Sequence, residues 1–488
     1  MKYATLKVLV LCMVLAVQSL VAQDYTITNE TTHDQNHFGW YISGAGNHCA
    51  ISDPRDVISD YGNGSVSLYR RRGGTWRFTH RITPNNPEKH GLFGHKTVMT
   101  DSHLAISAIG DSRQGFMAGA VSIYQLQDDA WTLISEVLPE RSDDKVQFGA
   151  ALAMDANYLF VGASGAKNHT GEVYVYAIEG NTVTLLQTID APHPVGYEFG
   201  KTLQLVGNTL IIGAPSTAKS VMKGGVFVYE LMDGVWQKVQ DIEPEDEEVG
   251  SWFGYAIAAD ENNLFISAPH NNVPHADGNE YAFAGKVYHY INQGDTWSLN
   301  TEILQETPHS HNFFGYQLQV DNGELFISSP NTDGAIKDQG VIYKYTNETG
   351  AWTVAQEYRL SDGTKTHLGH SFRSIDGEIL AGNGGQKKES NRGTVTVFND
   401  GYVPLSADKL TEPIQVSVYP NPSSERVQIE VDEMRAHKLA LFDLNGRQVL
   451  TKVFMRRTEI DVSNLNPGLY IISLKTKNQH VSKSLLVR

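Results

Sequence analysis

Cysteine is almost absent from this 488-residue sequence, which contains only Cys12 and Cys49. Cys12 lies in an apolar N-terminal run, so removal of that run would leave one cysteine and no disulfide within the chain. Paired-cysteine metal sites are excluded by the same count. Cys49 precedes Ala50 and Ile51 and is therefore predicted to be a small buried side chain rather than a reactive thiol.

Long hydrophobic runs, charged residues and catalytic motifs are also scarce. Beyond the N-terminus no segment is apolar over the length that spans a bilayer. Charged residues make up 19% of the chain against 41% hydrophobic residues, which excludes a mostly disordered protein. The chain has no G-x-S-x-G, H-E-x-x-H or G-x-x-x-x-G-K-S/T motif. No catalytic residue, metal or cofactor is therefore assigned.

The N-terminus has the order of a cleavable signal peptide. Two lysines precede an apolar run at residues 8–17, and small residues follow at 19–22. We expect residues 1–22 to be a signal peptide cleaved after Ala22. A lipid-modified Cys12 is the weaker alternative, because bulky residues stand where small ones would be needed before it.

The clearest pattern in the sequence is an internal repeat with a period of 51 to 61 residues. Each copy begins with Phe-Gly, or Leu-Gly in the last copy, and a Gly or Ser that closes an apolar pair follows fourteen residues later. A Gly-x-Val/Ile-x-x-Tyr/Phe pattern comes next, and five copies then have a Trp. The copies begin at Phe38, Phe93, Phe148, Phe199, Phe253, Phe314 and Leu368.

These fixed spacings predict four antiparallel strands in each copy. Turn pairs such as Gly207-Asn208 and Asn322-Gly323 separate runs with the two-residue alternation of strands. Seven such units predict an all-β fold, a seven-bladed β-propeller over residues 23–400. The last copy has no fourth strand, and we expect residues 24–30 to supply it and so close the ring.

The repeat resembles the FG-GAP repeats of integrin α-subunit propellers and, more closely, their shorter bacterial relatives. The fourth copy carries the resemblance best, with Phe199-Gly200, Gly213-Ala214-Pro215 and the run at 224–236. Integrin-type copies hold calcium in a loop between the first two strands. Here the spacing between the first two strands leaves room only for tight hairpins, such as residues 259–263. We therefore do not expect a calcium site in these copies.

The composition changes after residue 400. The net charge of −16 divides into +2 for residues 1–22, +4 for residues 418–488 and therefore −22 for residues 23–417. Residues 401–415 are predicted to be a linker, and residues 416–488 a small immunoglobulin-like β-sandwich of about seven strands. An acidic domain is thus followed by a basic one.

The C-terminal domain resembles the sorting domain of the type IX secretion system of Bacteroidetes. Tyr-Pro-Asn-Pro at 419–422 and Leu-x-x-Gly-x-Tyr at 465–470 carry the resemblance. It implies that the secretion machinery is a partner and that the protein passes through the periplasm to be secreted or held on the outer cell surface. The alternative is an adhesive sandwich module that stays on the mature protein.

One loop offers candidate binding residues, which are His270, Asn271, His275, Asp277 and Glu280. Their spacing fits no standard metal motif, so solvated loop residues are the simpler interpretation. The acidic run at residues 241–248 is likewise interpreted as a solvated loop.

The charge and the repeat together limit the function. An acidic propeller does not suit nucleic acid or an anionic membrane surface. We expect a secreted or cell-surface, non-catalytic module that binds a glycan or protein through loops joining strands two to three and four to the next copy. The alternative is an extracellular propeller enzyme acting on polysaccharide or peptide. Facing carboxylates or a bound metal in a pocket at the ring centre would favour the enzyme, and a broad face rich in exposed aromatic side chains would favour binding.

Overall fold

The computed structural model describes most of the chain after the predicted signal peptide. The described residues are 24–29, 37–57, 62–140, 143–192, 197–217, 223–245, 248–274, 278–294, 296–334, 337–348, 350–360, 367–383, 393–399, 416–431, 436–442, 448–463, 465–475 and 480–488. The predicted signal peptide (1–22) and linker (401–415) lie outside them. Contacts divide the chain into two compact units, residues 1–403 and 404–488.

In the described part of the N-terminal unit, the strands form seven four-stranded antiparallel sheets and one two-stranded ribbon. The first three sheets are β2 (Ile42–Ala45), β3 (His48–Asp53), β4 (Ser65–Arg72) and β5 (Thr75–Ile82); β6 (Phe93–Met99), β7 (His103–Ala108), β8 (Ala120–Gln127) and β9 (Ala130–Val137); and β10 (Phe148–Met154), β11 (Tyr158–Ala163), β12 (Glu172–Glu179) and β13 (Thr182–Asp190). A one-turn helix, α2 (Ala166–His169), lies between β11 and β12.

The other four sheets continue the same order, one for each copy of the repeat. They are β14 (Thr202–Val206), β15 (Thr209–Ala214), β16 (Gly225–Met232) and β17 (Val235–Ile242); β18 (Ile257–Ala259), β19 (Asn263–Ala268), β22 (Lys286–Asn292) and β23 (Trp297–Ile303); β24 (Leu318–Asp321), β25 (Glu324–Ser329), β26 (Val341–Thr346) and β27 (Thr353–Tyr358); and β28 (Ser371–Ile375), β29 (Glu378–Asn383), β30 (Thr394–Asn399) and β1 (Tyr25–Thr28). The ribbon is β20 (Val273–Pro274) and β21 (Glu280–Tyr281).

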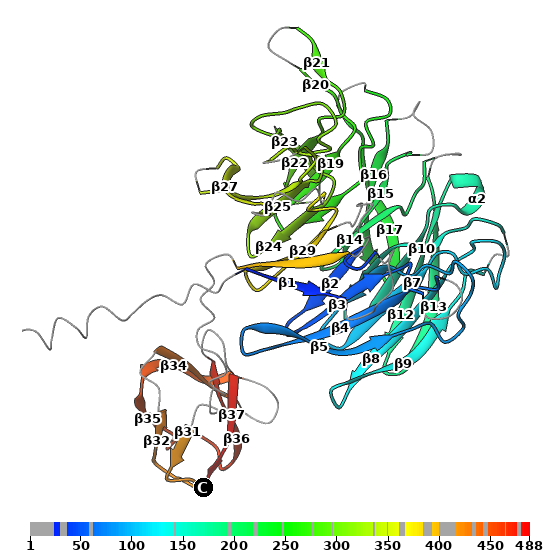
Figure 1. Ribbon diagram of the computed structural model, residues 1–488. Helices are drawn as coiled ribbons and strands as arrows, with labels where there is room; N and C mark the ends of the chain where they lie inside the picture. Colours follow the sequence, from blue (N-terminus) through cyan, green and yellow to red (C-terminus); the bar gives the residue numbers. More distant parts are fainter. Residues whose placement is uncertain are drawn as a thin grey trace, which may run out of the picture. The chain divides into compact units, whose positions relative to one another are not determined.

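The strand that follows the predicted signal peptide completes the last sheet. Tyr25 pairs with Val397 and Thr28 with Thr394, so β1 covers the free edge of β30. In Figure 1 the blue β1 lies beside the yellow strands of this sheet. The Tyr25 hydroxyl also accepts a hydrogen bond from the Trp76 backbone N–H of the first sheet, at 2.9 Å. The predicted closing strand is thereby confirmed.

Each copy is joined to the next at a glycine that directly precedes its third strand. At Gly171, where φ is +89°, an added Cβ would lie 2.1 Å from the Phe199 carbonyl oxygen of the following Phe-Gly pair. The same contact recurs between Gly393 and Phe38, which links the last copy to the first. Only a residue without a Cβ allows two backbones to approach so closely.

The first strands of the seven sheets also contact one another in order. β2, β6, β10, β14, β18, β24 and β28 each contact the next, and β28 contacts β2. The core lies between neighbouring sheets, where side chains such as Phe160 and Phe227 belong to one cluster. Cys49 is free and fully buried, as predicted.

The C-terminal unit has two sheets in its described part. One contains β31 (Val416–Tyr419), β32 (Arg426–Val431) and β35 (Arg457–Asp461), and the other contains β34 (Gln448–Met455), β33 (Ala436–Phe442), β36 (Gly468–Lys475) and β37 (His480–Val487). Both sheets contribute to one apolar core, in which Ile429, Leu441 and Ile472 are fully buried. This unit therefore has a core of its own.

Candidate functional site

The residue that follows each Phe-Gly or Leu-Gly pair lines one cavity of about 390 Å³. The Phe is buried, and the Gly after it adopts a positive φ, such as +91° at Gly149, so that the chain leaves the core at this point. All seven copies contribute, and the residues are Trp40, His95, Ala150, Lys201, Tyr255, Tyr316 and His370. The described residues that line this cavity include no Asp or Glu.

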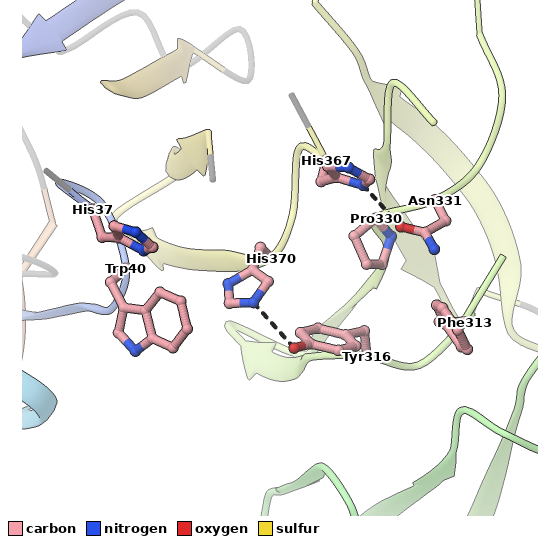
Figure 2. Close-up of a pocket in the computed structure, with 8 residues that line it drawn as sticks. All are labelled: His37, Trp40, Phe313, Tyr316, Pro330, Asn331, His367 and His370. Carbon is pink, nitrogen blue, oxygen red and sulfur yellow. Dashed lines mark hydrogen bonds between the residues drawn. The ribbon is translucent and has the colours of Figure 1, made fainter. Parts of the chain in front are cut away.

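A second pocket of about 340 Å³ adjoins this cavity, because Trp40, Tyr316 and His370 line both. Figure 2 shows its lining side chains, which come from the first, sixth and seventh copies. They lie next to a Phe-Gly or Leu-Gly pair or directly after the second strand, β25. The lining residues are His37, Trp40, Phe313, Tyr316, Pro330, Asn331, His367 and His370.

Ring contacts hold the aromatic side chains of the pocket in place. The His370 ring lies 5.0 Å from the Trp40 ring and 5.1 Å from the Tyr316 ring, measured between centroids. The Tyr316 hydroxyl and His370 Nε2 are 3.1 Å apart and form a hydrogen bond (Figure 2). Burial, with a smaller effect of Lys96, lowers the pKa of His370 to about 4. The imidazole is therefore neutral at pH 7 and adds to an apolar aromatic surface.

The residue before the pair is held in an uncommon backbone conformation. Phe313 has a φ of +54°, His367 a φ of +50° and Trp252 a φ of +62°. Bulky residues rarely adopt this left-handed region, and such strain is concentrated at ligand sites. His367 is further fixed by a 2.8 Å hydrogen bond between its Nδ1 and Asn331 Oδ1 (Figure 2).

The described candidate residues of the loop, His270, Asn271 and Glu280, lie in different surroundings. His270 stacks on Trp252 and on Phe313, with centroid distances of 3.3 and 5.1 Å, and thus lies next to the pocket. Burial lowers the pKa of His270 to about 4.

Two other candidates, Asn271 and Glu280, do not line the pocket. Asn271 is buried and donates a hydrogen bond to the Tyr288 hydroxyl at 3.4 Å, which is a structural contact. Glu280 is exposed on the β20–β21 ribbon and accepts a hydrogen bond from Asn272. His275 and Asp277 lie outside the described residues. Among the candidates that the structure describes, only His270 lies next to the pocket.

The residues on both sides of each Phe-Gly pair were not predicted as site residues from the sequence. The repeat itself could have indicated these positions. A side chain that varies between copies of a constant motif is one that packing of the core does not constrain. The residues after the pair range from Ala150 to Lys201 and Trp40 while the buried pair is kept. Variable positions within the motif thus mark the lining of the cavity.

In the described part of the chain, no group of three or more His, Cys, Asp or Glu side chains is placed to hold a metal ion. The carboxylates of the first hairpins have other partners. Asp155 Oδ1 accepts hydrogen bonds from the backbone N–H groups of Asn157 and Tyr158, each at 2.7 Å. Asp260 accepts an equivalent bond from Asn263 N–H. These carboxylates stabilise tight turns.

Removal of calcium is therefore expected to leave the melting temperature of the mature protein unchanged to within about 1 °C. The reason is that calcium needs several oxygen ligands from one compact loop, whereas these hairpins use theirs internally. Differential scanning calorimetry with EDTA and with excess calcium measures the effect. A rise of several degrees in calcium would contradict the prediction.

The C-terminal unit matches a known family. Residues 417–488 match the secretion system C-terminal sorting domain. The protein is thus an exported protein, and more particularly one that type IX secretion carries to the cell surface or the extracellular space. Among the described residues, no helix has the length and apolar character needed to cross a membrane.

Proposed function

We propose that residues 23–400 form a seven-bladed β-propeller of the FG-GAP type that binds an extracellular ligand without catalysis. Seven four-stranded sheets support the architecture, because their first strands contact one another in a closed order. The contact of Gly393 with Phe38 and the pairing of β1 with β30 support closure of the ring. Radial repetition of this kind protects the edges of the sheets.

The aromatic pocket supports a glycan as the ligand. Trp40, Tyr316 and His370 present partly exposed rings around a space of about 340 Å³, a volume within the usual range for ligand sites. A sugar ring has an apolar face of C–H groups that stacks on an aromatic ring. Polar groups at the rim, such as the Asn331 amide, can bond sugar hydroxyls. This set of aromatic rings is the single observation that carries the proposal.

The chemistry of the lining favours binding over hydrolysis. Glycoside hydrolysis generally uses a pair of carboxylates on either side of the scissile bond. The described lining of the cavity and of the adjoining pocket contains no Asp or Glu. The neutral state of His370 also removes it as a general acid at pH 7. A binding face is therefore the better explanation than an active site.

The substitution Trp40→Ala is expected to weaken glycan binding at least tenfold, which corresponds to about 1.4 kcal/mol. The ring of Trp40 lines both the pocket and the cavity, so its loss removes a stacking surface and leaves His370 unsupported. A glycan array on the mature protein identifies the ligand, and calorimetric titration measures the affinity of the variant.

Phe78→Ala is the matched control, because this side chain is exposed on β5 and lines neither space. It should leave the affinity unchanged. Equal affinities of wild type and Trp40→Ala would place the binding face elsewhere. Release of shorter sugars from the ligand would favour the enzyme, and binding only to a peptide array would identify a protein ligand.

A further inference from the structure

The cavity bounded by the first strands is positively charged inside an acidic unit. Lys96, Lys201 and Arg373 line it, and no Asp or Glu does so among the described residues. Residues 23–417 nevertheless carry a net charge of −22. The cations around this cavity are therefore a local feature, and their charge is opposite in sign to the net charge of the unit.

Two of the three cations lack a carboxylate partner in the described structure. Lys96 Nζ lies over the Tyr41 ring, 4.1 Å from its centroid. Arg373 forms no ion pair with the described residues, and its buried Nε has no hydrogen-bond partner among them. Asp321 acts on Arg373 only at longer range and accepts a hydrogen bond from Ser374 Oγ at 2.7 Å.

Lys201 differs from these two, because it pairs with Glu198 at 3.2 Å. Glu198 is itself buried and also accepts a hydrogen bond from Thr217 Oγ1. The charge of Lys201 is therefore partly neutralised by Glu198. The unbalanced charge of the cavity comes chiefly from Lys96 and Arg373.

Partial burial makes this charge costly, because it removes the cations from water. Burial, together with the nearby charge of Lys201, lowers the pKa of Lys96 to about 8. Burial lowers the pKa of Arg373 as well. A charge removed from water is stabilised when an opposite charge lies within hydrogen-bond reach. An anion in the cavity would supply that charge.

We propose that this cavity binds a single anionic group of the ligand, a sugar carboxylate or a sulfate ester, through Lys96 and Arg373. The inference rests on the proposed function, because it extends the glycan from the aromatic pocket into the cavity that shares Trp40, Tyr316 and His370 with it. Arg373 provides a fork of donors that matches a carboxylate or sulfate, and Lys96 provides a point charge.

The charge outside the cavity limits the ligand to one anionic group. A polyanionic glycan would be repelled by the net charge of −22 on residues 23–417 before it reached the cavity. A largely neutral oligosaccharide that ends in one uronate or one sulfated sugar avoids this repulsion. The cavity volume of about 390 Å³ is at the small end of ligand sites, which suits one terminal sugar.

Calorimetric titration of the mature protein with three matched oligosaccharides tests the inference. The probes share a neutral stem and end in glucose, in glucuronate or in sulfated glucose. The wild type should bind at least one anionic probe about tenfold or more tightly than the neutral probe, and the preferred probe identifies the anion. Lys96→Gln and Arg373→Gln should each remove that preference while the affinity for the neutral probe stays within about twofold.

Arg77→Gln is the control variant, because Arg77 is an exposed cation on β5. It should keep the preference. Thermal shifts with inorganic sulfate and free glucuronate provide a readout that does not need the aromatic pocket, since an anion that binds the folded state raises the melting temperature. At least one should stabilise the wild type more than Lys96→Gln.

The pH dependence gives a further readout. Lys96 must be protonated to hold the anion, so the preference should fall as pH rises through the pKa of Lys96, near 8 in the free protein. His95 and His370 face the same cavity but are neutral throughout, with pKa values lowered by burial to about 3 and 4. Burial raises the pKa values of Tyr41, Tyr255 and Tyr316, which also face it. The fall should be absent in Lys96→Gln.

The outcomes separate the inference from the proposed function. Equal binding of all three probes by the wild type, or equal loss of all three in Lys96→Gln, would overturn the anion site and leave glycan binding intact. Failure of every saccharide to bind, with no stabilisation by sulfate or glucuronate, would overturn both. In a third outcome, sulfate or glucuronate stabilises the wild type but not Lys96→Gln, and the neutral probe does not bind. This outcome would support the anion site alone.

Discussion

Gly171→Ala is expected to lower the free energy of unfolding of the N-terminal unit by about 3–5 kcal/mol, at the high end of single substitutions. The new Cβ would lie 2.1 Å from the Phe199 carbonyl oxygen and close to the Phe199 backbone N. Both atoms belong to the backbone of the next copy, so no side chain can move aside. The φ of +89° adds the strain of a left-handed conformation.

Gly207→Ala is the matched control for this substitution. Gly207 also has a positive φ, +54°, but no atom lies within 4 Å of an added Cβ. It should therefore cost only about 1–2 kcal/mol, the backbone strain alone. Urea unfolding of the mature protein, monitored by tryptophan fluorescence, compares the two. Equal losses would show that the contact between copies does not hold the sheets together.

Removal of residues 416–488 is expected to abolish export across the outer membrane and to leave the truncated protein in the periplasm. The reason is that these residues contain the match to the secretion system C-terminal sorting domain. Cell fractionation in the native host, with the mature protein detected by antibody, measures the effect. We expect nearly all of the surface or medium signal to be lost.

The same truncation is expected to leave the N-terminal unit folded. Each unit has its own apolar core, and β1 and β30 pair before residue 416. The melting transition of the purified truncated protein should match the transition of this unit in the full chain. Full-length Trp40→Ala is the control, since it alters the pocket but keeps the C-terminal unit and should be exported. Export of the truncated chain, or unfolding of its N-terminal unit, would contradict the prediction.

Much of the fold could be predicted because the repeat is local and regular. Constant spacing from Phe-Gly to the apolar pair and to the Gly-x-Val pattern predicts strands whose order the structure repeats in every copy. The missing fourth strand of the last copy indicated β1 as its replacement, and the two strands pair. An unpaired sheet edge is unfavourable, so an extra strand elsewhere in the chain is expected to pair with it.

The candidate site was much less predictable. The loop at 270–285 stood out by its length and polar residues, yet only His270 among its described candidates lies next to the pocket. Lys96 and Arg373 gave no signal, because isolated cations in a sequence usually lie on a solvated surface. Their significance depends on lining one cavity in which the described residues include no carboxylate.

The amino-acid sequence by itself determined the four-stranded unit, the number of its copies, the closing strand and the sorting domain, because each depends on local alternation or on a short motif. Only the tertiary structure decided which variable side chains meet. Residues after successive Phe-Gly pairs are more than fifty positions apart, and their common cavity exists because the last copy contacts the first. The positions of these residues recur with the repeat, but their side chains differ from copy to copy because the core does not constrain them.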